Sequence, residues 1–164
     1  MFGFGQLIGI LKKNPKKIVF TEGEDPRILE ASSRLLASYF LHPILIGDEK
    51  RIADAAEESG FNIRGAEIID PEKFDKIDEM VELYCELRKK KGVTPDQARE
   101  ILKQANYFGT MLVKMGFADA LLGGATYSTA DTVRPALQLI KTKPGNSIVS
   151  SCFILVRPSA TGEN

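Results

Sequence analysis

The stretch ALLGGATYSTADTVRPA, residues 120–136, decides how the rest of the sequence is interpreted. It places an apolar run, a glycine turn and two candidate helix caps in succession: Ala120–Leu122, Gly123–Gly124, and then Ser128 with Thr129. This order is typical of a buried strand that turns directly into a helix. Because the free backbone N–H groups of a helix start attract anions, the stretch predicts an anion site. An ordinary strand-to-helix connection is the alternative.

Three more apolar, β-branched runs lie upstream of this stretch, and helical patterns separate them. We expect strands at 17–20, 43–46 and 67–69, and a further buried strand at 147–156. This alternation predicts a three-layer α/β/α fold with a mainly parallel sheet and right-handed crossovers. The turns TEGED, IGD and GGATYST then gather beyond the carboxyl ends of the strands, where ligands of such sheets bind.

The expected helices follow from apolar periodicity and from start and stop signals. They cover an opening amphipathic segment, about Pro26 to Ser38, a segment up to about Ser59 with Gly60 after it, Phe74–Lys91, the stretch from the capping box at Thr94 to about Lys103, Ala105–Met115, and Ser128 to about Ile140.

The composition is that of an ordinary globular domain, with 43% hydrophobic and 27% charged residues among 164. Lys plus Arg and Asp plus Glu both number 22, so the net charge is zero and a nucleic acid is not an expected partner. The apolar N-terminus lacks a basic leader and a cleavage site and is too short to span a bilayer. We therefore expect a cytoplasmic protein with no membrane partner.

The cysteines and the histidine form no catalytic or metal-binding pattern. Cys85 and Cys152 lack paired spacing and are interpreted as reduced core residues, and His42 is interpreted as a strand-end residue before Pro43. No metal site is expected, and a zinc enzyme or a cysteine protease is disfavoured.

The glycine motifs of common nucleotide-binding and hydrolase folds are missing. The sequence has no G-x-G-x-x-G after its first strand, no G-x-x-x-x-G-K-[ST] and no G-x-S-x-G elbow. Ser128 is better placed as a cap than as a nucleophile, because the only histidine, His42, lies far upstream. For Glu22, Glu24 and Asp25, acid–base chemistry and a plain helix-start preference both stay open.

Three arginines stand at turn positions: Arg27, Arg88 and Arg134. Arginine holds phosphate or carboxylate in a planar fork, so three arginines converging on one cleft would suit a ligand with several phosphates. Their convergence is inferred from the topology. For Arg88, in the basic run before Gly92, the alternative is a solvated helix end that complements the helix dipole.

Four blocks of the sequence carry a family resemblance. The blocks TEGEDPRILEAS, LIGD, ELRKKKG and ADALLGGATYSTADTVRPALQLI resemble segments of the phosphate acetyl/butyryltransferase family, which includes the phosphate acetyltransferases. The resemblance runs in register from about Lys16 to the last residue. It implies reversible transfer of an acetyl group between acetyl phosphate and coenzyme A, without a metal at the reacting centre. The family fold is a two-domain α/β fold like that of isocitrate and isopropylmalate dehydrogenases, and its members are commonly dimers.

The resemblance also implies roles for particular residues. By their places in these blocks, Arg27, Arg88 and Arg134 are expected to bind the phosphate of acetyl phosphate or the phosphates of coenzyme A. Ser128 and Thr129 are expected to be secondary contacts. Coenzyme A and acetyl-CoA enter as substrates, so no tightly bound cofactor is expected. The implied partners are small molecules and, for the full-length enzyme, a second copy.

Family members are considerably longer than this chain, and the resemblance implies that their catalytic serine–arginine pair and aspartate lie in the later part. We interpret 1–145 as an N-terminal α/β domain and 146–164 as the opening strand of a truncated second domain, with no catalytic residue in this fragment. One alternative is a butyryl or other acyl-phosphate transferase. Another is a noncatalytic acetyl-CoA-binding regulatory domain of the kind fused to malic enzymes. The start of the chain at Met1, with its own expected opening helix, argues against this alternative.

Overall fold

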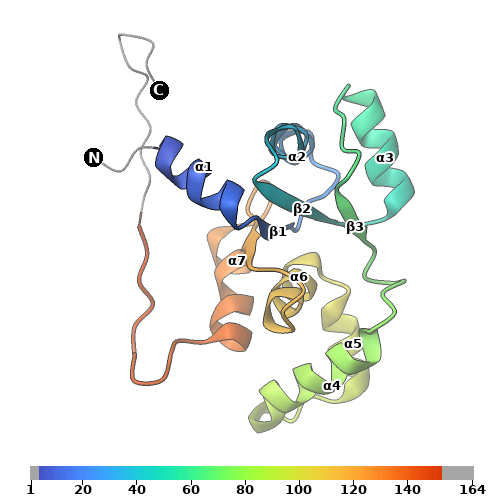
Figure 1. The fold of residues 1–164 in the computed structure, drawn as a ribbon. Helices are drawn as coiled ribbons and strands as arrows, with labels where there is room; N and C mark the ends of the chain where they lie inside the picture. Colours follow the sequence, from blue (N-terminus) through green and yellow to red (C-terminus); the bar gives the residue numbers. More distant parts are fainter. Residues whose placement is uncertain (1–3, 153–164) are drawn as a thin grey trace.

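A computed structural model describes residues 4–152 and contains a four-stranded parallel sheet (Figure 1). The strands are β1 (Lys16–Phe20), β2 (Leu41–Ile46), β3 (Glu67–Ile69) and β4 (Ala120–Leu122), in the spatial order β3-β2-β1-β4. Val19 of β1 lies opposite Ile44 on one side and Leu121 on the other. The predicted α/β class and parallel sheet are confirmed.

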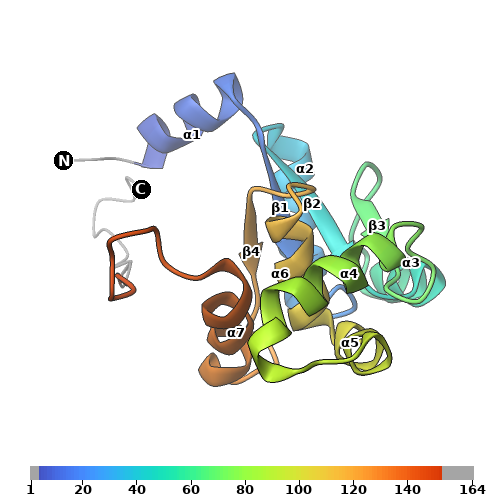
Figure 2. The same cartoon turned by 90° about the horizontal axis from the view of Figure 1, so that it is seen from below.

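Helices cover both faces of the sheet. They are α1 (Phe4–Lys13), α2 (Pro26–Ser38), α3 (Glu49–Glu58), α4 (Ile77–Arg88), α5 (Pro95–Leu102), α6 (Ala105–Lys114) and α7 (Thr129–Pro135), with a 3-10 turn η1 (Lys89–Lys91) and a π-helical segment η2 (Ala136–Ile140). In Figure 1, α2 and α3 lie above the sheet and α4, α5 and α6 below it. Figure 2 shows the same fold from below, with the lower layer in front and α7 beside α6.

Alternate residues of the strands build the two cores. Phe20 and Leu45 point to the face covered by α2 and α3, where they pack with Leu29 and Ile52. Their neighbours Val19 and Ile44 belong to the larger core on the other face, with the buried residues of α4, α5 and α6. This period of two along each strand, with apolar residues on both faces, makes the sheet the middle layer of three.

The predicted helix starts are confirmed by their caps. The Thr94 hydroxyl accepts the N–H of Gln97 while the Gln97 side chain accepts the N–H of Thr94, which completes the predicted capping box. Ser128 caps α7, as the sequence indicated. Gly60 follows the C-cap of α3 with φ of 72°, a left-handed conformation that suits glycine.

The bounds of one predicted helix, one predicted strand and one predicted burial are wrong. The helix predicted at Phe74–Lys91 is shorter than expected: α4 runs from Ile77 to Arg88, and the basic run Lys89–Lys91 forms the 3-10 turn η1. The Phe74 ring, before the helix, packs edge-on against Phe108 with ring centroids 5.3 Å apart. Residues 147–152 form no strand and the side chain of Ile148 is 80% exposed, since no strand lies beside them within residues 4–152. Cys152, predicted to be buried, is exposed there.

Residues 153–156 of the predicted last strand lie outside the described part, so the division of the chain at 145/146 stays a prediction. The other cysteine, Cys85, is half-buried in α4 and packs against the core. His42 lies near the start of β2 and is exposed, as expected of a strand-end residue. Over residues 4–152, no helix combines the length and the apolar character that crossing a membrane requires.

Candidate functional site

The candidate site lies where the chain reverses the direction in which it adds strands. From β1 the chain first moves outward to β2 and β3, then returns across the sheet to place β4 on the other side of β1. Ligands of open α/β sheets bind beyond the carboxyl ends of the strands at such a switch point. Here the loop after β1, residues 21–25, meets the turn after β4, residues 123–127, and the N–H of Thr21 donates to the carbonyl of Leu122 over 3.4 Å.

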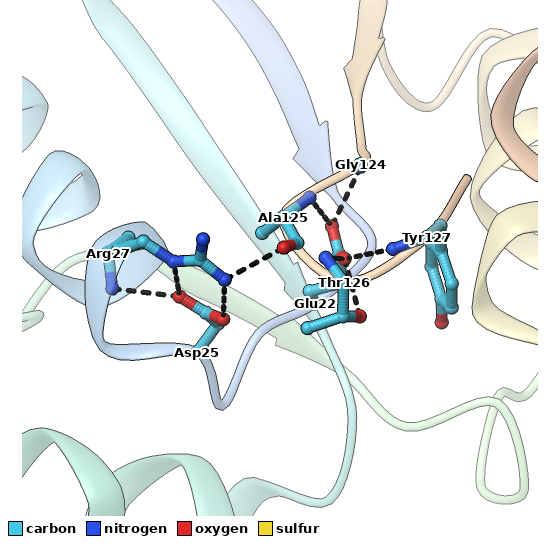
Figure 3. A network of polar contacts seen from close by, with 7 residues as sticks. All are labelled: Glu22, Asp25, Arg27, Gly124, Ala125, Thr126 and Tyr127. Carbon is cyan, nitrogen blue, oxygen red and sulfur yellow. Dashed lines mark hydrogen bonds and ion pairs between the residues drawn. The ribbon is translucent and has the colours of Figure 1, made fainter. Parts of the chain in front are cut away.

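The carboxylate of Glu22 fills the turn after β4 (Figure 3). It accepts hydrogen bonds from the N–H groups of Gly124 at 2.9 Å, Ala125 at 3.0 Å and Tyr127 at 3.2 Å, and from the Thr126 hydroxyl at 2.7 Å. The N–H of Thr126 donates to it as well. The turn therefore does hold an anion, but the anion is the protein's own side chain, so the predicted phosphate cradle is already occupied.

The environment of Glu22 fixes its charge state. Burial leaves this residue only 9% exposed and by itself raises the pKa of the carboxyl group. The hydrogen bonds from the hydroxyl and the N–H of Thr126, together with those of the two preceding residues, outweigh burial and lower the Glu22 pKa below its usual value. Glu22 is thus an anion at neutral pH, and beside it burial and this charge raise the pKa of Tyr127.

The two glycines of the turn allow this close approach. A Cβ at Gly123 would lie 2.7 Å from the hydroxyl oxygen of Thr21, the residue after β1, so any larger residue would force the two loops apart or displace that hydroxyl. Gly124 has φ of 108°, a conformation that side chains rarely adopt. The glycine pair is therefore explained by the packing of two loops and does not by itself indicate a nucleotide.

Arg27 lies beside the same turn. Its Nε and Nη2 atoms donate to the Asp25 carboxylate at 2.9 and 2.7 Å, and Nη2 also donates to the carbonyl oxygen of Ala125 at 2.8 Å. Asp25 in turn caps α2 by accepting the N–H of Arg27, and the hydrogen bonds from Arg27 lower the pKa of this carboxyl group. The side chain of Arg27 remains 67% exposed, so its outer edge faces solvent.

Ser128 and Thr129 have different places at the start of α7. The Ser128 hydroxyl accepts the N–H of Asp131 at 3.2 Å and donates to its carboxylate at 2.6 Å, so both functions of the hydroxyl serve the cap. Thr129 is the first residue of α7 and is exposed. Of the two candidate caps that the sequence analysis named, Ser128 is therefore the N-cap of α7 and Thr129 is not.

Arg134 and Arg88 lie on the side of the domain formed by α4, α6 and α7. Arg134 is exposed, 3.9 Å from the Asp131 carboxylate, and lines a hollow of about 150 Å³ with Tyr107. Arg88 ends α4 and is half-buried, and within residues 4–152 its Nε atom is buried with no hydrogen-bond partner. Burial raises the pKa of Tyr84, and the charge of Arg88 opposes this rise. The centroid of the Tyr84 ring lies 6.4 Å from that of Tyr107.

The three arginines that the sequence analysis singled out lie on three different helices, α2, α4 and α7. Arg134 lines a hollow with Tyr107 that does not include Arg88, whereas Arg27 is hydrogen-bonded to the turn after β4. No observation in residues 4–152 places all three guanidinium groups around one cavity. Their convergence on a single ligand stays a prediction.

A cleft of about 680 Å³ opens at the carboxyl ends of β1, β2 and β3, and its cations were not predicted. Arg51 binds Glu24 at 2.7 Å, and Lys73 lies 3.1 Å from Asp48 and 2.8 Å from Asp70. Lys103, also in the cleft, pairs with Glu100 at 2.7 Å. The sequence features closest to these cations were the predicted IGD turn and the predicted strand that ends just before Asp70, and neither indicates a cation.

Each of these cations is already paired with a carboxylate, which limits what the cleft offers to an anion. Glu22 and Tyr127 also line it, so the cleft and the turn after β4 share a wall. Within residues 4–152, no group of three or more His, Cys, Asp or Glu side chains is arranged to hold a metal ion.

The fold and site define a three-layer α/β domain whose switch point carries a carboxylate-filled glycine turn, with arginines on the neighbouring helices. Residues 4–163 match the family described as phosphate acetyl/butaryl transferase, and the chain belongs to that family. It is 47% identical over 154 residues to a phosphate acetyltransferase from Thermoanaerobacterium thermosaccharolyticum and 50% identical over 141 residues to one from Bacillus subtilis. The predicted family is confirmed.

Solved structures agree with this assignment. The EutD phosphotransacetylase from Staphylococcus aureus superposes with a TM-score of 0.81 at 44% identity, covering 90% of this chain and 46% of that one. A phosphotransacetylase from Streptococcus pyogenes gives the same TM-score, 0.81, at 43% identity. The two sequence relatives are matched over 93% and 86% of this chain but only 46% and 43% of their own lengths. The chain thus spans less than half of the relatives it matches.

Proposed function

We propose that this chain is the part of a phosphate acetyltransferase that binds the phosphate groups of its substrates. The complete reaction transfers an acetyl group reversibly between acetyl phosphate and coenzyme A. The observation that carries the proposal is the match of residues 4–163 to one acyltransferase family, together with 47–50% identity to relatives named phosphate acetyltransferase.

Arg27, Arg88 and Arg134 bind the phosphates of coenzyme A or acetyl phosphate in this proposal, with Ser128 and Thr129 as secondary contacts. Arg88 supports it best, because within residues 4–152 its guanidinium Nε has no hydrogen-bond partner, so no protein acceptor competes for that donor. Arg134 adds an exposed charge that is held only loosely, at 3.9 Å from Asp131. The Ser128 hydroxyl, engaged in its cap, serves by holding the helix start.

In this proposal the arginines stabilise the phosphate leaving group of the acetyl transfer. The sulfur of coenzyme A attacks the carbonyl carbon of acetyl phosphate, the bond from that carbon to the bridging oxygen breaks, and phosphate leaves, while the thiol proton passes to a base. Guanidinium groups on the phosphate neutralise the charge that grows on the leaving group. By family resemblance, the base and the oxyanion donors belong to the portion of the relatives that this chain does not cover.

The proposal extends to the setting of the enzyme. We place it in the cytoplasm as a homodimer that uses coenzyme A as a substrate and carries no tightly bound cofactor. Two alternatives remain within reach of experiment: a preference for butyryl or another acyl phosphate, and a noncatalytic domain that binds acetyl-CoA and regulates a partner.

A chimera tests the activity directly. The chain is joined to the remaining C-terminal part of the Bacillus subtilis relative, which is 50% identical over the matched 141 residues. We expect consumption of acetyl phosphate that depends on coenzyme A. A folded chimera that is inactive with acetyl, propionyl and butyryl phosphate, while the chain still binds acetyl-CoA, supports the regulatory alternative. Activity only with butyryl phosphate supports the other.

The arginine assignment has its own test in the same chimera. Replacing Arg134 by Ala should weaken substrate binding by about 1.5–3 kcal/mol, as for the loss of a charged hydrogen bond. Replacing Arg88 by Ala should weaken binding of coenzyme A more than binding of its analogue without the 3′-phosphate. Equal losses for the two ligands would remove Arg88 from the 3′-phosphate contact.

A further inference from the structure

Glu22 has no part in the phosphate contacts proposed above, yet it is the most highly coordinated side chain at the switch point. We propose that Glu22 is a positioning residue: its carboxylate sets the turn at 124–127, and through it the start of α7 and the place of Arg134. This inference rests on the proposed function for its effect on ligand binding. Its effect on the turn itself does not depend on that function.

The turn needs an anion in order to keep its shape. Four consecutive N–H groups, from Gly124 to Tyr127, point into one concavity and donate to the same carboxylate. Such a nest of N–H groups is unsatisfied and self-repelling without a negative charge at its centre. Because the next residue, Ser128, is the N-cap of α7, the geometry of the nest determines where that helix begins.

The carboxylate arrives from a rigid loop, so it acts as a fixed reference for the turn. The N–H of Gly23 donates to the Ile46 carbonyl at 3.3 Å, and a Cβ at Gly23 would lie 2.7 Å from that oxygen. The loop after β1 is therefore pressed against β2 on one side while Glu22 reaches the turn after β4 on the other. A side chain held in this way ties the exits of three strands together.

Charged groups around Glu22 come from several elements. Asp25 and, to a smaller extent, Glu22 raise the pKa of Arg27 on α2, and burial together with the Glu22 charge raises the pKa of Tyr127 in the turn. The other ionisable groups that line the shared cleft are Glu24, Asp25, Asp48, Arg51, Asp70, Glu72, Lys73 and Lys103. Among all of these, only Glu22 accepts the N–H groups of the turn, so a change confined to residues 124–127 reports on Glu22.

Glu22→Gln in the 164-residue chain tests the positioning role. The amide keeps the size of the side chain but presents one acceptor oxygen and a donor to the four N–H groups. We expect hydrogen exchange of the 124–127 amides to accelerate at least about tenfold, the ratio for one or two lost hydrogen bonds, while amides of β1 and β2 stay unchanged. Glu30→Gln is the matched control, because Glu30 pairs only with Arg34 on the surface of α2, at 2.5 Å.

A milder variant and a titration cover the case in which Glu22→Gln does not fold. Thr126→Val removes the hydroxyl that donates to Glu22 at 2.7 Å and leaves the backbone donors in place, so a smaller acceleration of exchange confined to the same turn is expected. In the unaltered chain, the amide NMR signals of residues 124–127 should shift together with the protonation of the Glu22 carboxyl group in acid. Exchange and shifts at the turn that are indifferent to Glu22 would overturn the proposal.

Binding of coenzyme A separates this inference from the proposed function. If both hold, coenzyme A binds the chain, its affinity falls in acid as Glu22 is protonated, and Glu22→Gln shows a weaker affinity without that acid step. If the turn loosens in the variant but coenzyme A and acetyl phosphate do not bind even the unaltered chain or the chimera, the positioning role stands and the proposed function fails. If binding and its acid step are the same in Glu22→Gln, Glu22 does not position the ligand site.

Discussion

The guanidinium of Arg27 joins two loops that are far apart in the sequence, because Nη2 donates both to Asp25 at 2.7 Å and to the carbonyl oxygen of Ala125 at 2.8 Å. This contact and the Glu22 carboxylate are the two polar links between the exit of β1 and the exit of β4 shown in Figure 3. One places a cation outside the turn and the other an anion inside it. The turn is therefore held from both sides before any ligand arrives.

This arrangement predicts that Arg27→Ala affects ligand binding more than stability. The Arg27 side chain is 67% exposed, so solvent screens its pair with Asp25 and the pair contributes little to the free energy of unfolding. Loss of a charged contact to phosphate costs about 1.5–3 kcal/mol of binding. Urea unfolding and calorimetric titration with coenzyme A measure the two effects. Arg34→Ala, on the same helix and paired only with Glu30, is the control that should change neither by more than a small amount.

Ser128→Ala should destabilise the protein, whereas Thr129→Ala should be almost neutral. The Ser128 hydroxyl accepts the N–H of Asp131, and loss of such a cap costs about 0.5–2 kcal/mol in the free energy of unfolding. Thr129 is exposed and follows the cap. Denaturant unfolding of the two variants side by side measures the difference. Equal destabilisation would show that the capping role is shared.

Local signals correctly predicted the strands of the observed sheet and the caps at Thr94 and Ser128, whereas the errors depend on contacts between distant segments. Thr94 and Gln97 are three residues apart, so their capping box can be recognised without knowledge of the fold. Phe74 continues a helical apolar period, but its ring packs on Phe108 from outside the helix. Apolar residues near Ile148 match a strand in composition, yet a strand also needs a neighbour.

The candidate site shows the same limit. The sequence predicted that backbone N–H groups at the glycine turn would hold a phosphate, whereas in the structure they hold the Glu22 carboxylate. Which anion fills it depends on β1 lying next to β4, and the sequence places Glu22 about a hundred residues before the turn. The cations of the cleft, Arg51 and Lys73, were missed for the same reason, since their carboxylate partners come from neighbouring strand ends.

Acid should weaken the fold partly through Asp119. This carboxylate accepts the N–H of Lys17 and the ammonium of Lys16, both at 2.9 Å, and these two contacts lower its pKa below the usual value. A carboxyl group whose pKa is lower in the folded state stabilises the fold above its unfolded pKa of about 3.9, and that contribution is lost as the pH falls through the folded pKa. The free energy of unfolding should therefore start to drop below about pH 5 and go on falling as the pH passes through the lowered pKa of Asp119.

Asp119→Asn isolates this contribution. The variant should be less stable than the parent chain near neutral pH, and its free energy of unfolding should fall less steeply in acid. Urea unfolding at several pH values gives both quantities. Asp54→Asn is the comparison, because within residues 4–152 the exposed Asp54 forms an ion pair only with Lys50 of its own helix, at 3.4 Å. A parallel loss of stability in both variants across the acid range would rule out a special role for Asp119.

Gly109→Ala should destabilise the protein by steric crowding, although alanine normally stabilises the middle of a helix relative to glycine. A Cβ at this position of α6 would lie 3.0 Å from side-chain carbons of Leu121 and Val19, so the helix could not stay as close to β1 and β4. Overpacking of this kind costs about 1–3 kcal/mol. Replacing glycine by alanine in a helix gains about 1 kcal/mol, so a cost in the upper part of the range exceeds the gain. Gly109→Ala should therefore lower the thermal midpoint. Gly9→Ala in α1, with no atom within 4 Å of the new Cβ, should leave the midpoint unchanged or raise it. A midpoint that rises in both variants would show that the sheet moves aside for the methyl group.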